Sequence, residues 1–356
     1  MLETRLTKLL GCQYPIVQTA MGWVADPKLV SASCNAGAIG FLAGATIPAD
    51  KVEANIQELK SLTDRPFGIN FHMYQANAED IVDLVVSYKV AAVSYSRSPG
   101  KDMIRRLKKA DVVCMPTVGL PKHALKAVEL GADAVTIQGA EGGGHTGAIP
   151  TTLLLPTVVD LVGKDVPVIA AGGFRDGRGL VSALANGADG IAMGTRFMMT
   201  KDSPTPPETL DRYLSCDNPA EIVVSRAIDG IPQRMILNEM LSTLEQAGIF
   251  KKWVIAIKSG LAYRKFTGLT VMEVFRSALK MNLESDLTVV QSIMAANAPM
   301  IIQRAMVDGD PANGVLPSGQ VAGVIDELLS CEDLVKGIVS QAEQILAEFA
   351  LRAPSG

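Results

Sequence analysis

A histidine inside a run of glycines is the residue of this sequence best suited to acid–base chemistry. His145 lies in QGAEGGGHTG, residues 138–147, directly after the apolar run AVTI. Residues 142–147 also match G-x-G-x-x-G, the loop that binds dinucleotides. That interpretation requires a helix at the third glycine and an acidic residue at the end of the next strand, and the sequence has neither. Because imidazole titrates near neutral pH, the sequence instead predicts a general base or proton donor at His145, with purely local hydrogen bonding as the alternative.

Glycines follow two later apolar runs, at positions suited to binding a phosphate. One run, VPVIAAGG, ends at Gly172 and Gly173, and the other, GIAMGT, ends at Gly194 and Thr195. Glycine lets backbone N–H groups come close to an anion, and a helix that begins just afterwards, near Asp176, adds a favourable dipole. We therefore expect a phosphorylated ligand at these loops. The alternative is that the glycines only form tight turns.

Other side chains stand at the ends of apolar runs, where they could surround a ligand. Asn70 and Gln138 each offer a donor and an acceptor to a heteroaromatic ring, or stabilise only their own turns. His72 either lines the same opening or caps its strand. The stretch MGW, residues 21–23, supplies a close backbone approach and an apolar cover. His123 stands at a helix start and is expected to face solvent.

The first 200 residues must position these groups, and they show apolar, β-rich runs that alternate with amphipathic helical segments. Eight such runs begin at Pro15, Ala38, Pro66, Val90, Asp111, Ala134, Pro167 and Gly190. Most are continuously apolar, as parallel strands covered on both faces are. Two segments, LKAVELGADAVTIQG and VSALANGADGIAMGT, repeat one order of helix, glycine, Ala-Asp and buried strand. The pattern predicts an α/β fold, a (β/α)8 or TIM barrel rather than an open sheet, with function at the carboxyl ends of the strands.

The pattern changes after Thr200. Residues 201–209, KDSPTPPET, contain three prolines, and residues 210–306 are rich in helix signals with little strand signal. We therefore expect an added helical domain inserted after strand 8, residues 205–314, that serves as a substrate lid, and a barrel made of residues 1–204 and 315–356. The insertion also carries basic residues that would form a solvated helix face or contact an acidic substrate tail: Lys251, Lys252, Lys258, Arg264 and Lys265.

Composition argues against several classes of function. The 356 residues carry a formal net charge of -4, so no basic surface for nucleic acid is indicated. The apolar runs are too short to span a bilayer and the first residues show no secretory signal, so we expect a cytoplasmic protein that does not enter a membrane. The five cysteines lie far apart without a C-x-x-C pair, and we expect buried thiols and no metal site.

Taken together, the residues resemble the nitronate monooxygenase (2-nitropropane dioxygenase) family of FMN-dependent barrels. The matching stretches are PIVQTAMGWV, NAGAIGFLA, LTDRPFGINF, GADAVTIQGAEGGGHTG, VPVIAAGGFRDGRGLVSALANGADGIAMGTRF and SGQVAGVIDELLSCEDL. They cover most of the predicted barrel and the C-terminal return. The resemblance implies a flavoprotein with FMN as its cofactor and His145 as its catalytic residue.

The resemblance also implies which residues hold the FMN. The phosphate would lie on Gly172, Gly173, Gly194 and Thr195. The ring would lie against Ala20, Met21 and Gly22, and further cofactor-binding residues would be Asn70, His72, Thr117, Gln138 and Gly143. Two departures from the family bear on the substrate. The turn after strand 1 reads Thr-Ala-Met where relatives often carry Ala-Pro-Met or Gly-Gly-Met, and some relatives have lysine at the position of Thr117.

The first hypothesis for function is an FMN-dependent oxidoreductase that oxidises alkyl nitronates with O2 to carbonyl compounds and nitrite. The stretches MGWV, EGGGHTG and SGQVAG resemble those of a branch of flavin oxidoreductases that act on CoA thioesters in steroid-ring degradation. A dehydrogenase or reductase of a CoA thioester is therefore the alternative, as is an NAD(P)H:quinone reductase. The redox partner of this small-molecule enzyme would be O2 or NAD(P)H, and a homodimer is a candidate assembly. A non-catalytic sensor of a phosphorylated ligand is a third hypothesis.

Overall fold

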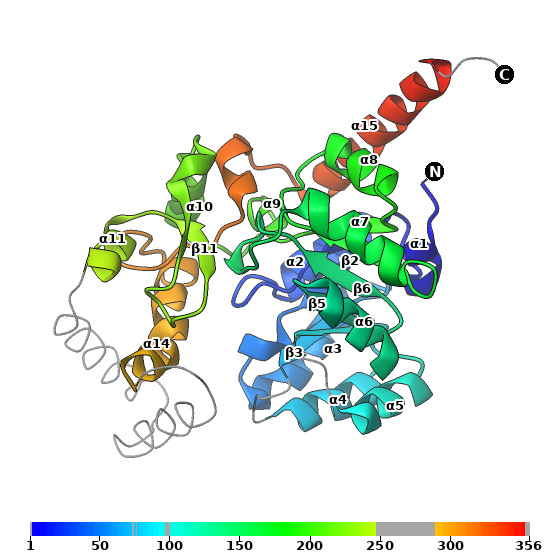
Figure 1. Cartoon of the computed structure of the whole chain (residues 1–356). Helices are drawn as coiled ribbons and strands as arrows, with labels where there is room; N and C mark the ends of the chain where they lie inside the picture. Colours follow the sequence, from blue (N-terminus) through cyan, green and yellow to red (C-terminus); the bar gives the residue numbers. More distant parts are fainter. Residues whose placement is uncertain (1, 73–74, 76, 97–99, 247–288, 353–356) are drawn as a thin grey trace. The chain divides into compact units, whose positions relative to one another are not determined.

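The computed structural model describes residues 2–72, 75, 77–96, 100–246 and 289–352 (Figure 1). The basic group predicted between residues 251 and 265 lies outside the described residues. The chain forms two compact units. The first comprises Met1–Gly142, Thr146–Pro204 and Ile325–Gly356, and the second comprises Gly143–His145 and Thr205–Val324. No helix in the described part of the chain is long and apolar enough to cross a membrane.

A closed barrel of parallel strands forms the centre of the first unit (Figure 1). The strands follow the order β1-β2-β3-β4-β5-β6-β8-β9, and β1 pairs with β9 to close the ring. Each strand lies within one of the eight predicted runs, so the predicted barrel is confirmed. The bounds are β1 Ile16–Gln18, β2 Ile39–Leu42, β3 Gly68–His72, β4 Ala92–Ser96, β5 Val113–Val118, β6 Val135–Gln138, β8 Val168–Ala171 and β9 Gly190–Met193.

Helices join successive strands and cover the outside of the barrel. Their bounds are α1 Arg5–Leu10, α2 Pro27–Asn35, α3 Val52–Leu62, α4 Ala78–Ser87, α5 Lys101–Lys109, α6 Pro121–Leu130, α7 Thr151–Val162, α8 Gly177–Ala185 and α9 Thr195–Met198. Two short 3-10 helices, η1 Gly44–Thr46 and η2 Ala49–Lys51, precede α3. As predicted, His123 on α6 is exposed, and all five cysteines are buried free thiols.

The repeated Gly-Ala-Asp sequence has the same structural role at both of its positions. Gly131 and Gly187, which follow α6 and α8, have φ angles of 103° and 87°, as predicted for the residue after a helix. The Asp133 carboxylate accepts a backbone N–H of β5 at 3.0 Å, and the Asp189 carboxylate accepts one of β8 at 3.0 Å. Each repeat therefore turns the chain and fastens the start of its strand to the preceding one.

Alternate strand residues divide between two apolar layers. Neighbouring strand positions in register face the same way, and successive residues face opposite ways. The inner layer fills the barrel and includes Val17, Ile39, Phe41, Ala92, Met115, Ala134, Ile169, Ala171 and Ala192. The outer layer packs beneath the helices and includes Val30, Ile56, Ile69, Phe71, Ile81, Val93 and Leu107. The inner positions can therefore be followed along each strand to the residues at its carboxyl end.

The second unit combines helices with a small sheet of order β10-β11-β7. Its strands are β7 Gly144–His145, β10 Ile222–Ser225 and β11 Gln233–Ile236, all paired antiparallel. Its helices are α10 Pro207–Leu214, α11 Glu239–Gln246 and α14 Val289–Met306, with 3-10 helices η3 Pro219–Glu221 and η4 Gln320–Val324. The sequence predicted helix here with little strand signal. These three strands were therefore missed.

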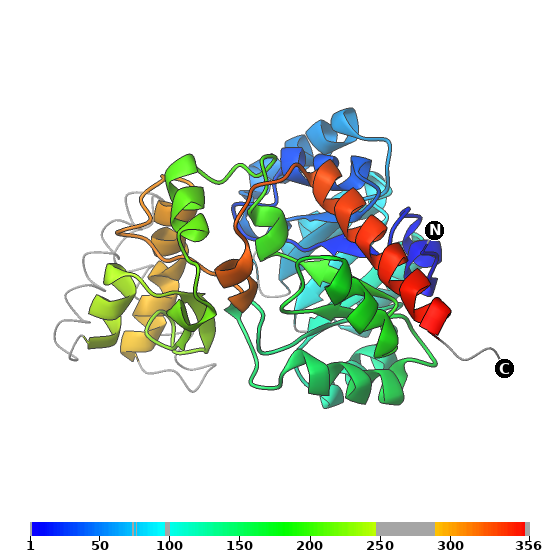
Figure 2. The same cartoon turned by 90° about the horizontal axis from the view of Figure 1, so that it is seen from above.

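The C-terminal helix α15, Cys331–Arg352, packs against α8 and α2 of the first unit (Figure 2). The contact with α8 is very close. A Cβ atom on Gly177, the first residue of α8, would come within 2.6 Å of backbone atoms of Ile338 and Ala342. The Gly177 N–H also donates to Oε1 of Gln341 at 2.7 Å. The two helices can approach this closely because residue 177 has no side chain.

Replacing Gly177 with alanine should therefore lower the free energy of unfolding by about 1–3 kcal/mol, because the added methyl group would push two backbones apart. Gly337→Ala is the matched control. Gly337 is exposed on α15, and a Cβ there would meet nothing within 4 Å. This control should raise the free energy of unfolding by up to about 1 kcal/mol through helix propensity. Urea unfolding followed by circular dichroism measures both, and the same response from both variants would contradict the close contact.

Candidate functional site

Three of the predicted site residues point into the barrel at the carboxyl ends of their strands. Gln138 at the end of β6 is in register with Ala171 of the inner layer. Thr117 on β5 lies two residues after Met115, which also belongs to the inner layer. Asn70 on β3 also faces the inside of the barrel, as the register of β3 with β4 shows. The amide and hydroxyl groups of these residues therefore share one edge of the barrel.

Contacts with β4 fix the two predicted residues of β3. The Asn70 amide donates to the carbonyl and hydroxyl oxygens of Ser94 at 3.1 and 3.3 Å. This orientation leaves Oδ1 as the group of Asn70 that can accept from a ligand. His72 is exposed at the end of β3, and its Nδ1 lies 3.0 Å from the Ser96 hydroxyl. His72 therefore stands at the opening and also ties its strand to the next.

The turn after β1 lies beside the end of β9. A Cβ atom on Gly194 would come within 3.0 Å of the Thr19 hydroxyl and 3.4 Å of the Met21 sulfur. Trp23 follows in the same turn with a φ of 62°, a left-handed conformation that is rare for a bulky residue. Backbone strain of this kind is concentrated at functional sites. The predicted ring-binding stretch 20–22 is thus next to one of the predicted phosphate loops.

The loops after β8 and β9 could hold a phosphate. Gly172 and Gly173 have φ angles of 109° and 81°, which glycine adopts without strain. β9 leads through Gly194 directly into the short helix α9, which begins at Thr195. Backbone N–H groups of two such loops and of a short extra helix form the usual phosphate site of a parallel barrel.

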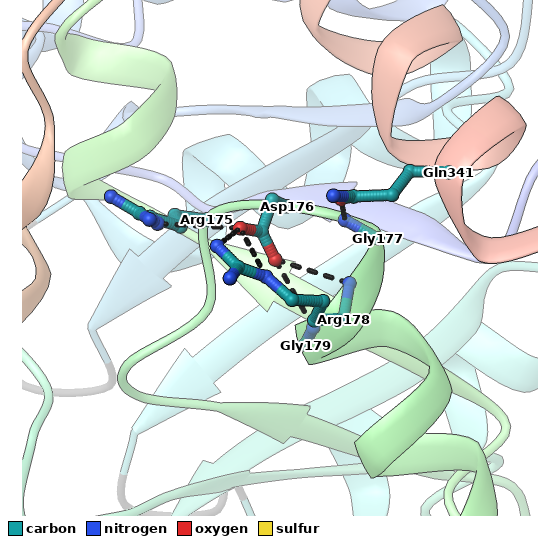
Figure 3. Close-up of polar contacts among 6 residues, drawn as sticks. All are labelled: Arg175, Asp176, Gly177, Arg178, Gly179 and Gln341. Carbon is teal, nitrogen blue, oxygen red and sulfur yellow. Dashed lines mark hydrogen bonds and ion pairs between the residues drawn. The ribbon is translucent and has the colours of Figure 1, made fainter. Parts of the chain in front are cut away.

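By contrast, the first backbone N–H groups of α8 already donate hydrogen bonds to side chains of this protein (Figure 3). The Asp176 carboxylate accepts the N–H groups of Arg178 and Gly179 at 3.1 and 3.4 Å, and Gln341 accepts that of Gly177. Burial opposes ionisation of Asp176, but the ion pair with Arg178 keeps the pKa of Asp176 below its ordinary value. The first N–H groups of this helix therefore have protein partners, and the predicted contribution of α8 to a phosphate site is limited to its dipole.

His145 lies on the strand β7. Its glycine neighbours had suggested a flexible loop instead. β7 pairs with β11, and His145 is opposite Gln233 in the register. The Nε2 atom of His145 lies 2.7 Å from Oδ2 of Asp229. The His145 side chain is 57% exposed, whereas that of Asp229 is 8% exposed. The imidazole is therefore accessible to a substrate while a buried carboxylate holds one of its nitrogens.

Asp229 is a candidate functional residue that the sequence did not reveal. It lies in the connection between β10 and β11, where an Asp-Gly pair signals only a turn. Burial would raise the pKa of Asp229, but hydrogen bonds from His145, the Ile231 N–H and Gln233 hold it below its ordinary value. Asp229 therefore faces His145 as a carboxylate. Their closeness could not be predicted, because the two residues are 84 positions apart.

Gly143 has a packing role within the second unit. A Cβ atom on it would come within 2.5 Å of the Gly319 nitrogen and 2.6 Å of the Ser318 carbonyl carbon. The EGGGHTG and SGQVAG stretches therefore meet at this glycine. Its assignment as a cofactor-binding residue stays a prediction.

The closed barrel defines a (β/α)8-barrel protein, and its polar side chains lie at the carboxyl ends of the strands, the edge at which such barrels bind their ligands. The model of the nitronate monooxygenase family matches residues 3–341. The chain therefore belongs to the nitronate monooxygenase family, as the sequence motifs suggested.

Known relatives include proteins named for two different substrates. The (3aS,4S,5R,7aS)-5-hydroxy-7a-methyl-1-oxo-octahydro-1H-indene-4-carboxyl-CoA dehydrogenase of Rhodococcus jostii is 45% identical over 353 residues, which cover 99% of both chains. A probable nitronate monooxygenase of Staphylococcus saprophyticus is 31% identical over 292 residues, 69% of this chain and 81% of that one. A solved structure of a FabK mutant from Thermotoga maritima has a TM-score of 0.78 and 28% identity, covering 98% of this chain and 99% of that chain.

Family membership indicates an oxidoreductase and implies a flavin cofactor, and the residues at the barrel edge fit one. Gly172 and Gly173 have the left-handed conformations typical of phosphate-binding loops, and a side chain at residue 194 would fill the space beside Thr19 and Met21. The inward amide and hydroxyl groups of the same edge supply both donors and acceptors for a polar heteroaromatic ring.

Gly194→Leu should therefore give a folded protein with little bound flavin, because the new side chain would occupy the space between β1 and β9. Gly100→Leu is the control, since a Cβ on Gly100, the residue before α5, would meet nothing within 4 Å. The ratio of visible flavin absorbance to protein absorbance after purification measures the effect. Full flavin content in Gly194→Leu would remove this loop from the cofactor site.

Proposed function

We propose that this protein is an FMN-dependent dehydrogenase of a CoA thioester whose acyl group is a saturated ring carboxylate. The observation that carries the proposal is the 45% identity to the Rhodococcus CoA-thioester dehydrogenase over 99% of both chains. The match to the staphylococcal nitronate monooxygenase is 31% identical and covers 69% of this chain. Oxidation of alkyl nitronates, the first hypothesis from the sequence, therefore becomes the second candidate, supported by the family itself.

In this proposal the FMN phosphate is held by backbone N–H groups of Gly172, Gly173, Gly194 and Thr195. The ring lies against Ala20, Met21 and Gly22, with its polar edge near Asn70, His72, Thr117 and Gln138. The positive φ angles of the first loop and the contact of the second with the β1 turn support this arrangement. When bound, FMN accepts the two electrons that the substrate loses.

His145 is the proposed general base. A thioester carbonyl makes the neighbouring C–H bond acidic, and an imidazole that titrates near neutral pH can remove that proton. The exposure of His145 and its contact with the buried Asp229 support this role. The C–H electrons remain on the substrate and form the new double bond, while a hydride leaves from the adjacent carbon. A nitroalkane would lose its acidic proton to the same base.

We further propose that the second unit selects the substrate. The support is that His145 and Asp229 both belong to this unit, so the base is part of the same body as the inserted region.

Anaerobic titration of the purified protein tests the substrate class. A CoA thioester of a saturated ring carboxylate should bleach the visible flavin absorbance, because dehydrogenation delivers two electrons to the cofactor. An alkyl nitronate and NADH, added in parallel, should bleach it more slowly or not at all. Rapid bleaching by the nitronate and none by the thioester would establish the second candidate instead, and bleaching by NADH alone would indicate a reductase.

His145→Asn should retain its flavin and lose roughly 10²–10⁴-fold in the rate of substrate-dependent flavin reduction, the usual contribution of a general base. Stopped-flow absorbance measures this rate directly. A nitroalkane and its preformed nitronate provide an internal control, because the nitronate has already lost its proton and should be less affected. Equal and small losses for both forms would show that His145 is not the base.

A further inference from the structure

Asp229 is held in place by several contacts besides the one with His145. Its Oδ2 atom, 2.7 Å from His145 Nε2, also accepts from Nε2 of Gln233 at 2.5 Å. Its Oδ1 atom accepts the backbone N–H of Ile231 at 3.0 Å, the geometry of an Asx turn. Asp229 and Gln233 are both buried. The carboxylate is therefore fixed on both oxygens and does not depend on the histidine for its position.

The register of β7 with β11 places these groups on one face of the sheet. Gln233 is directly opposite His145, and Arg234 is opposite Gly144. Because successive side chains of a strand alternate between faces, Arg234 lies on the other face, where its guanidinium donates to the Ile222 carbonyl at 3.1 Å. The Asp229 carboxylate and the Gln233 side chain therefore lie on the same face of the sheet as the imidazole.

We propose that Asp229 is a positioning residue for His145, and that Gln233 positions Asp229 in turn. Asp229 orients the ring through Nε2 and stabilises the positive charge that the ring gains when it takes a proton from carbon. In this step a substrate C–H bond breaks, an N–H bond forms on His145, and Asp229 keeps its negative charge throughout. The proposal rests on the role of His145 as general base. The lowered pKa of Asp229 agrees with an anion at this position.

The small number of histidines makes the proposal directly measurable. The chain has three, so the imidazole signals of the full-length holoprotein can be assigned in NMR spectra with isotope-labelled histidine and the variants His72→Gln and His123→Gln. In Asp229→Asn the neutral ring of His145 should carry less of its proton on Nε2, because the wild-type carboxylate is the acceptor for that N–H. Asparagine can still accept the Ile231 N–H, so the turn should persist. The same tautomer of His145 in both proteins would overturn the proposal.

Two further variants separate charge from packing. Asp229→Glu keeps the carboxylate and should keep the proton of the neutral His145 ring on Nε2 to a greater extent than Asp229→Asn does. Gln233→Leu leaves the charge but removes one of its hydrogen-bond donors, so the tautomer of His145 should change less than in Asp229→Asn. Equal changes in all three variants would indicate general disruption of the turn and would also overturn the proposal.

Kinetics provide an activity readout that is independent of this NMR comparison. Asp229→Asn should slow flavin reduction by the active substrate at least roughly tenfold, with a larger effect on kcat than on KM, and Asp229→Glu should recover part of the rate. If wild-type flavin is reduced by neither a thioester nor a nitroalkane, the proposed function fails while the NMR comparison of the ring tautomers still decides the positioning role. If the wild type reacts and Asp229→Asn reacts equally fast, the positioning role alone fails.

Discussion

The pairing of β1 with β9 is the interaction on which the polar edge of the barrel depends. These strands are the first and last of the barrel along the chain, and their parallel register closes the ring. Closure brings Gly194 against Thr19 and Met21, so a predicted phosphate loop and a predicted ring-binding turn become neighbours. Because all the barrel strands run in the same direction, their carboxyl ends meet at this one edge. The proposed cofactor site is thus a consequence of closure and of the absence of a side chain at residue 194.

A second constraint acts on the base. The chain leaves the first unit for three residues after Gly142, and two of them form β7 in the sheet of the second unit. A strand of two residues has little stability of its own. Its position is set by the hydrogen bonds to β11, by the packing of Gly143 against Ser318 and Gly319, and by the contact of His145 with Asp229. Glycines that look like a flexible loop in the sequence therefore allow close packing that immobilises the histidine.

The parts of the molecule that could be predicted are those with a sequence pattern confined to a short stretch of the chain. Each barrel strand is a short apolar run, the Gly-Ala-Asp repeats mark helix ends, and parallel strands put the residues that follow them on one edge. The contact of Gln341 with the start of α8 was not predictable, because Gln341 is 164 residues away. Asp229 was missed for the same reason, since an Asp-Gly pair in isolation indicates a turn. Both cases depend on a contact between segments that are far apart in the sequence. No local sequence pattern predicts such a contact.

The proposed role of His145 would explain how one family can include enzymes named for chemically different substrates. A thioester carbonyl and a nitro group both acidify the neighbouring C–H bond, so a histidine held by a carboxylate suits either compound. The proposed base and the flavin would then not discriminate between them, and selection would come from binding contacts. Roughly a third of this chain falls outside the match to the staphylococcal nitronate monooxygenase, whereas the match to the CoA-thioester dehydrogenase leaves almost nothing out. Similarity over the whole chain is therefore the better guide to substrate class, because the redox and proton-transfer groups would be common to both activities.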